Sequence, residues 1–282
     1  MKKIILTILM GLLILSGCSA TDDSQETTSK PIIAVAIAPL KGFAETIVGD
    51  KMEVSLMIPQ GASPENYEIT SSQMMSFNDA QVYFSLELPA EVNSILPVVS
   101  ETTEVIDLKT IVAASYPTLK LGDEDDPHIW MSIKRSEVMV ATMLSEIEKL
   151  DPDNRDFYEA NAQALLQELS DLDTEVTAAL AATDVKEFIA YHPAFQYFAD
   201  DYGLKMIAIE EDGKEATASQ LMEIVDYAKA ASIKAIFYQA EIDSSQAESI
   251  ASEIGGETIQ LNPLAEDYIA NYREMVDLIS NN

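Results

Sequence analysis

The sequence predicts an α/β protein of two lobes, each with a small parallel sheet flanked by helices, joined by one long rigid helix. Two observations predict this fold. Short apolar runs bounded by turn residues alternate with helical stretches, which is the pattern of βαβ units with parallel strands. These runs form two sets, separated by a long amphipathic stretch. We expect strands at 32–38, 54–58, 81–85, 104–108, 187–191, 206–209, 235–238 and 258–261.

The joining helix is predicted over residues 156–182, between an N-terminal lobe at 31–155 and a C-terminal lobe at 183–282. Asp151 and Pro152 supply start signals before it. At 1.5 Å per residue this helix is roughly 40 Å long, enough to brace both lobes, so we expect little lobe closure. One face of it should be buried, because its apolar residues recur at three- and four-residue steps. They are Tyr158, Ala162, Leu165, Leu169, Leu172, Val176 and Leu180.

The N-terminus has the pattern of a secretion signal. Residues 1–17 combine Lys2 and Lys3 with an uncharged apolar run that is too short to span a bilayer comfortably. Small residues come directly before Cys18, the only cysteine. This segment resembles a bacterial lipobox, in which cleavage exposes the cysteine for lipidation, and the polar residues 18–30 indicate a flexible tether. We expect a protein held at the outer face of the cell membrane through its N-terminal lipid only.

Charge and composition exclude several classes of function. The 282 residues include 17 Lys and Arg against 48 Asp and Glu, which gives a formal net charge of −31 at pH 7. Such a surface repels nucleic acid, so we expect no nucleic-acid partner. With two histidines and one cysteine, the chain cannot build a cysteine-rich metal cluster or a disulfide scaffold. A hydrophobic fraction of 48% is that of an ordinary globular protein.

Both histidines lie at positions where parallel sheets bind ligands. His192 follows the predicted strand 187–191 directly, at the carboxyl end that borders the crevice of open α/β sheets. His128 ends an acidic loop just before a helical region, and Glu65 lies in a loop after the strand ending at residue 58. If the two lobes face each other across a cleft, these three loops converge there.

The surroundings of these three residues have plainer interpretations. We interpret the acidic run from Asp123 to Asp126 as a solvated loop. Trp130 and Phe195 are expected to form dry walls behind the imidazoles. Glu65 itself has an alternative interpretation as a solvated loop carboxylate, because Glu is abundant in this chain.

Six segments carry a resemblance to a known family. They are the lipobox, PQGASPENYE, DPHIW, YHPAFQYF, GKEATASQL and LNPLA. In these segments, whose order matches over essentially the whole mature chain, the protein resembles the metal-binding lipoproteins of ABC importers, the zinc and manganese cluster called the ZnuA or TroA family. The resemblance implies the TroA-like (class III) periplasmic-binding fold and one transition-metal ion in the interlobe cleft. It also implies delivery of that ion to a permease with its ATPase. We expect a monomer without enzymatic activity.

The resemblance also implies a ligand set, from which this chain departs in places. Members place a histidine after the proline of the first segment, where this chain has Glu65. His128 and His192 match the family pattern without alteration. The fourth ligand is commonly an acid in the last segment, where this chain has Asn262.

The fourth ligand therefore stays open. Asn262 could offer its amide oxygen or hold a bound water, and either is weaker than the carboxylate it replaces. A further family acid is replaced here by Gln239. The candidates for the fourth position are Asn262, Gln239, Glu241, Glu266 and water. We expect a lower metal affinity than that of a relative with four ligands.

Two imidazoles and one carboxylate provide three donors, which fit tetrahedral zinc with an open or weakly filled fourth position. The same donors fit Mn²⁺ or Fe²⁺ in a wider shell. Nitrogen-rich sites bind late first-row metals more tightly, so Zn²⁺ is favoured, although Glu65 moves the balance toward the harder ions. Because protons compete for both histidines, the metal affinity should depend on pH.

Three other functions fit parts of the sequence. A zinc-dependent hydrolase also uses three ligands and an open position, but the chain has no HExxH or GxSxG motif. A binder of a chelated metal, such as a siderophore, needs a broad aromatic or basic pocket, for which a chain with 48 acids offers few cations. A role in cell adhesion is often attached to such lipoproteins, and no feature of this sequence demands it.

Overall fold

The computed structural model describes residues 30–210, 214–242 and 245–282. The predicted signal segment, Cys18 and nearly all of the tether lie outside the described residues. Within the described ranges, none of the helices combines the length and the apolar character needed to span a bilayer.

The first lobe is built on a parallel sheet of four strands in the order β2-β1-β3-β4. The strands are β1 (Ile32–Val35), β2 (Glu53–Leu56), β3 (Val82–Ser85) and β4 (Glu104–Asp107). The helices of this lobe are α1 (Ala38–Val48), α2 (Ser71–Phe77), α3 (Leu108–Ala113) and α4 (Ile133–Leu150). Two short helical turns, η1 (Glu91–Ile95) and η2 (Leu96–Val98), follow β3.

The predicted first strand, 32–38, is too long at its end. In the structure β1 ends at Val35, and α1 begins at Ala38. Pro39 lies in the first turn of α1, where the missing N–H of proline has no partner to lose and its fixed φ angle suits a helix. The apolar residues 36–38 are therefore buried by the connection to a helix and not by a strand.

The second lobe repeats the architecture with a parallel sheet in the order β10-β9-β7-β8. Its strands are β7 (Glu187–Ala190), β8 (Lys205–Ala208), β9 (Ala235–Tyr238) and β10 (Glu257–Gln260). Its helices are α6 (Gln196–Tyr202), α7 (Ala218–Ala231), α8 (Ser245–Ile254) and α9 (Tyr268–Ser280). The predicted fold of two small parallel sheets flanked by helices is confirmed.

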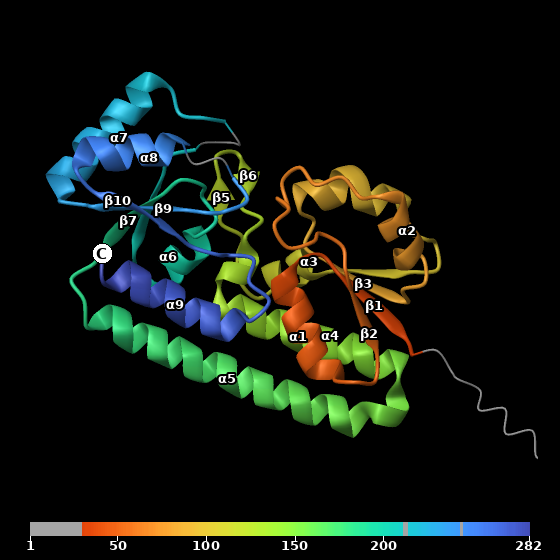
Figure 1. Ribbon diagram of the computed structural model, residues 1–282. Helices are drawn as coiled ribbons and strands as arrows, with labels where there is room; N and C mark the ends of the chain where they lie inside the picture. Colours follow the sequence, from red (N-terminus) through yellow and green to blue (C-terminus); the bar gives the residue numbers. More distant parts are fainter. Residues whose placement is uncertain (1–29, 211–213, 243–244) are drawn as a thin grey trace, which may run out of the picture.

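One helix, α5 (Arg155–Ala181), runs beneath both lobes (Figure 1). It agrees with the predicted joining helix to within one residue at each end, and the seven apolar residues predicted to line its inner face are buried. It packs against α1 and α4 of the first lobe and against α9 of the second. The core is consequently continuous from one lobe to the other through α5.

The lobes also contact each other through the short turn η3 (Ile129–Met131), which follows a hairpin. The hairpin consists of β5 (Lys120–Leu121) and β6 (Glu124–Asp125). Trp130 donates its indole N–H to the main-chain oxygen of Pro263 at 2.8 Å, and Tyr268 donates its hydroxyl to the oxygen of Trp130 at 2.8 Å. These buried bonds fix the loop that carries His128 against the start of α9.

Candidate metal centre

Glu65 lies in the turn that follows β2. Its main-chain N–H donates to the Ser63 hydroxyl at 3.2 Å, and Pro64 accepts a main-chain hydrogen bond from Ala90 at 3.0 Å. Ala90 directly precedes η1, so the loop after β3 supports the turn of Glu65. The Glu65 side chain remains 35% exposed, which places its carboxylate at the mouth of the site.

His128 is held by the carboxylate two residues before it. One oxygen of Asp126 lies 2.9 Å from the main-chain nitrogen of His128 and 2.7 Å from the ring nitrogen Nδ1. An ionised carboxylate can only accept, so Nδ1 carries the proton and Nε2 presents a lone pair. Asp126 and His128 are fully buried or nearly so. The interpretation of the whole acidic run as a solvated loop is therefore wrong for Asp126.

His192 follows β7 and has a carboxylate partner of its own. Its Nδ1 lies 3.2 Å from an oxygen of Glu210, and both side chains are buried. The register of the sheet explains this contact, because Ala190 of β7 pairs with Ala208 of β8, and His192 and Glu210 each come two residues later. As with His128, a proton on Nδ1 leaves the Nε2 lone pair free.

The structure brings Glu65, His128 and His192 together. The two Nε2 atoms lie 3.2 Å apart, and one oxygen of Glu65 lies 3.8 Å from His128 Nε2 and 3.6 Å from His192 Nε2. With both Nδ1 protons directed to carboxylates, three acceptors converge here without a donor between them. Zinc at its usual distance of about 2.0–2.1 Å from each imidazole nitrogen would separate two tetrahedral nitrogen ligands by about 3.3 Å. The observed spacing of the imidazoles therefore suits a shared cation.

The cavity at this cluster is very small. It leaves about 10 Å³ for the centre of a water-sized body, which is room for a single water or ion. Its lining residues are Ser63, Pro64, Glu65, His128, Trp130, His192, Gln239, Glu241, Ile242, Pro263 and Leu264. Trp130 lies 5.2 Å from the His128 ring, centre to centre, and is buried, as is Phe195. Such a space fits a bare ion and excludes an organic chelate of drug-like size in this conformation.

Asn262 is not brought to the cluster. Its side chain oxygen accepts a hydrogen bond from the N–H of Leu264 at 3.0 Å, which closes the turn, and its main-chain oxygen accepts from the Asn271 amide at 2.7 Å. Asn262 is exposed and lines a separate surface pocket. An asparagine that bonds the main chain two residues on is a turn-forming residue, and that role accounts for Asn262 here.

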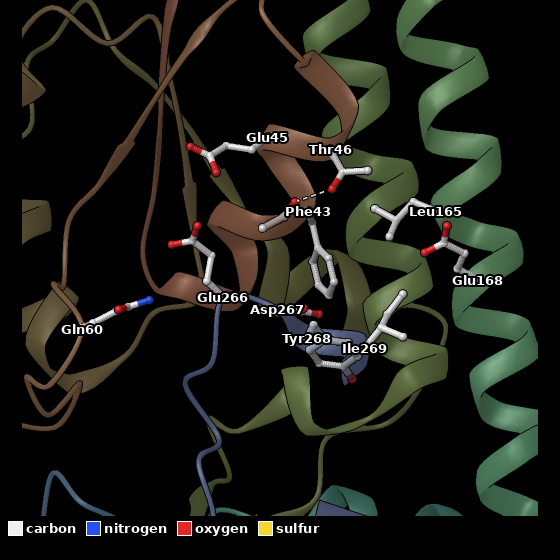
Figure 2. Close-up of a pocket in the computed structure, with 11 residues that line it drawn as sticks. Phe43, Glu45, Thr46, Gln60, Leu165, Glu168, Glu266, Asp267, Tyr268 and Ile269 are labelled. Carbon is white, nitrogen blue, oxygen red and sulfur yellow. Dashed lines mark hydrogen bonds between the residues drawn. The ribbon is translucent and has the colours of Figure 1, made fainter. Parts of the chain in front are cut away.

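Glu266 also lies elsewhere, at a wider groove of about 790 Å³ formed by α1, α5 and the start of α9 (Figure 2). Figure 2 shows Glu266 beside Glu45 at the rim of this groove. The carboxylate of Glu266 pairs with the Lys41 ammonium at 2.9 Å. It is therefore partnered, and it does not line the histidine cavity.

Two carboxylates at the site were missed from the sequence, Asp126 and Glu210. Asp126 gave a local signal, because an acid two residues before a buried histidine can bond both its main-chain N–H and its ring. Glu210 gave a signal only through strand pairing, since the alignment of β7 with β8 places it beside His192.

Comparison with known proteins decides the family. The chain matches the family described as ZnuA, zinc-uptake complex component A periplasmic, over residues 33–282. The chain belongs to the ZnuA family. The resemblance noted in the sequence is thereby confirmed. The solved structure titled "Crystal structure of ZnuA" superposes on this chain with a TM-score of 0.83 at 33% identity, covering 90% of this chain and 99% of that one.

Three curated relatives carry names that bear on the metal. The high-affinity zinc uptake system protein ZnuA of Bacillus subtilis is 30% identical over 88% of this chain and 83% of its own length. The zinc-binding lipoprotein AdcA of Streptococcus pneumoniae is 29% identical over 94% of this chain, which spans only 56% of that longer protein. The manganese-binding lipoprotein MntA of Halalkalibacterium halodurans is 26% identical over 90% of this chain and 87% of its own length.

Proposed function

We propose that this protein is the solute-binding component of an ABC importer that captures one divalent transition-metal ion between its lobes and delivers it to a permease. Zn²⁺ is the favoured ion, and Mn²⁺ or Fe²⁺ is the alternative. The observation that carries the proposal is the convergence of two imidazole lone pairs and one carboxylate, each histidine backed by its own buried carboxylate. The zinc-binding names of the first two relatives support the choice of metal.

The donor set supports zinc for a physical reason. Imidazole nitrogen binds late first-row divalent metals more tightly than Mn²⁺, in the order Mn²⁺ < Fe²⁺ < Zn²⁺ among these three. Two of the three donors here are imidazoles, and the small cavity suits a low coordination number. The carboxylate of Glu65 is the donor that keeps the harder ions as the alternative.

Competition with a chromogenic chelator tests the proposal directly. Purified protein should bind one equivalent of Zn²⁺ more tightly than Mn²⁺, and His128→Ala and His192→Ala should each lose this binding. Glu65→Gln should weaken this binding, and Glu68→Gln is its matched control, because Glu68 is exposed three residues further along the chain. One-to-one binding that survives both histidine substitutions would reject the metal centre.

The remaining features of the protein are proposals as well. We propose that the mature chain begins at Cys18, that lipid on this residue anchors the protein at the extracytoplasmic face, and that residues 18–30 form the tether. The lobes are assigned to 31–155 and 183–282, and the protein acts as a monomer without enzymatic activity. Metabolic labelling with a radioactive fatty acid should mark the protein and not its Cys18→Ala variant; equal labelling of the two would contradict the anchor.

A further inference from the structure

Two polar residues, Gln239 and Glu241, lie in the turn that follows β9, and neither belongs to the three proposed ligands. β9 pairs with β7 so that Phe237 lies opposite Ala190. Continuing that register places Gln239 next to His192, and Glu241 follows in the same turn. Both residues line the small cavity together with Glu65, His128 and His192.

Each of these residues has a buried polar atom without a hydrogen-bond partner. The amide nitrogen Nε2 of Gln239, a residue only 5% exposed, is unpartnered, and so is the carboxylate oxygen Oε2 of Glu241. Buried polar groups nearly always have a partner in folded proteins, and an unpaired carboxylate oxygen is the costlier of the two. The position of Glu241 therefore indicates a partner that is not part of the chain.

A cation in the cavity is the partner that fits Glu241. No Lys or Arg lies among the described residues that line the cavity. The two imidazoles, with their Nδ1 atoms directed at Asp126 and Glu210, turn lone pairs inward and not N–H groups. A carboxylate among lone pairs gains more from a divalent cation than from a neutral donor such as the Gln239 amide, because the cation attracts the carboxylate and the lone pairs together.

We propose, on the basis of the metal binding proposed above, that Glu241 is the fourth donor to the ion. The centre then has two nitrogens and two carboxylates, so the charge of a divalent ion is fully neutralised by its ligands inside a small cavity. Glu241 stands outside the group whose ligand atoms lie within 4.8 Å of one another. Coordination therefore draws the turn 239–242 inward when the ion binds. Glu241 would thus supply the carboxylate that is absent at Gln239 and Asn262.

Glu241→Gln tests this assignment, with Asn262→Ala as the matched control from the position suggested by the family resemblance. In chelator competition we expect Glu241→Gln to retain one bound Zn²⁺ but to lose affinity by at least the roughly 10- to 100-fold that outer partners of metal ligands cost. Asn262→Ala should stay within about twofold of the unmodified protein. The visible absorption spectrum of bound Co²⁺ should change in Glu241→Gln and not in Asn262→Ala, because a direct ligand is exchanged.

Thermal melting separates coordination from a structural role. Without metal, Glu241→Gln should melt at the same temperature as the unmodified protein or higher, because it replaces a carboxylate whose buried oxygen Oε2 has no hydrogen-bond partner. With saturating Zn²⁺ its melting temperature should rise less than that of the unmodified protein. A lower melting temperature without metal would mean that Glu241 supports the fold, and this result would overturn the assignment.

Two further outcomes would overturn it and remain distinguishable from failure of the proposed function. A loss of affinity with an unchanged Co²⁺ spectrum would assign Glu241 to a metal-bound water and not to the metal. Unchanged affinity in Glu241→Gln, with binding lost in His128→Ala, would leave the metal centre standing with three protein ligands. Only unchanged binding in His128→Ala and His192→Ala would reject the centre as a whole.

Discussion

His128 and His192 face each other across the cleft, yet the carboxylates behind them are supplied in different ways. Asp126 is two residues from His128, is completely buried, and contacts both the ring and the main chain of its partner. Glu210 reaches His192 from the neighbouring strand and makes one longer contact of 3.2 Å. One imidazole is thus oriented by local sequence and the other by sheet pairing. The contact between Asp126 and His128 is the shorter of the two, so we expect Asp126 to contribute more to the metal affinity than Glu210 does.

Among the substitutions that test this comparison, Asp126→Asn should have the largest effect on Zn²⁺ affinity. Loss of the charged acceptor weakens control of the His128 tautomer, so Zn²⁺ affinity should fall roughly 10- to 100-fold. Chelator competition measures the change. Asp123→Asn is the control, because Asp123 is exposed in the same acidic run and should leave the affinity unchanged. Equal affinities of the two variants would show that Asp126 does not orient the ligand.

Glu210→Gln should lower the Zn²⁺ affinity less than Asp126→Asn, about tenfold or below, because Glu210 makes a single, longer contact with its histidine. The same titration compares the two variants. Glu257→Gln serves as the control in the same sheet, since Glu257 is exposed at the start of β10. A larger loss for Glu210→Gln than for Asp126→Asn would reverse the ranking of the two supports.

The loop of the third proposed ligand, Glu65, is supported by a loop that holds another carboxyl group. Glu91 lies in η1, where it is completely buried and accepts hydrogen bonds from Tyr83 and from the main-chain N–H groups of Leu86 and Leu88. This loop supports the Glu65 turn through the bond from Ala90 to Pro64. Burial raises the pKa of Glu91 despite these hydrogen bonds.

The raised pKa of Glu91 predicts a pH effect on stability of known sign. The raised pKa of Glu91 adds to the free energy of unfolding. This contribution is fully present below the ordinary glutamate pKa of about 4.3 and is lost as pH rises through the higher folded-state pKa. Glu91→Gln removes this titration. The melting temperature of the variant minus that of the unmodified protein, both without metal, should therefore increase with pH above about 4.3. A difference that stays constant or falls across this range would contradict the raised pKa.

The smallest expected effect is that of Asn262→Asp. The family resemblance alone predicts tighter binding from an acid at this position. In the structure the side chain closes its own turn and lines another pocket, so the Zn²⁺ affinity should change by less than about twofold. A gain of tenfold or more by chelator competition would mean that residue 262 reaches the metal after all.

The sequence predicted most of the fold because hydrophobic periodicity is a local property. The alternation of apolar runs and the stripe along α5 were sufficient for both sheets and for the joining helix. The first strand was drawn too long because residues 36–38 are as apolar as a strand, and only Pro39 marks the helix. Apolar character alone does not distinguish a buried strand from the buried start of a helix.

The site was harder to predict, because burial decides which acid supports His128 and strand register decides which acid supports His192. The grouping of Glu65, His128 and His192 was anticipated from segments that lie far apart in the chain. Asp126 was taken for part of a solvated run, since four acids in a row look alike until one of them turns inward. Glu210 becomes visible only once the register of β7 and β8 is known.

The unbroken core along α5 has a consequence for how an ion leaves. A hinge-like separation of the two lobes would expose the apolar stripe of this helix to water. The free-energy cost of that exposure grows with every side chain that leaves the core. A Cβ on Gly42 would already lie 2.2 Å from the main-chain oxygen of Glu266, which shows how tightly α1 sits on the chain entering α9. We therefore expect the ion to leave through local movement of the turns that carry Glu65 and Glu241. The long helix α5 and the helices packed against it should keep their positions.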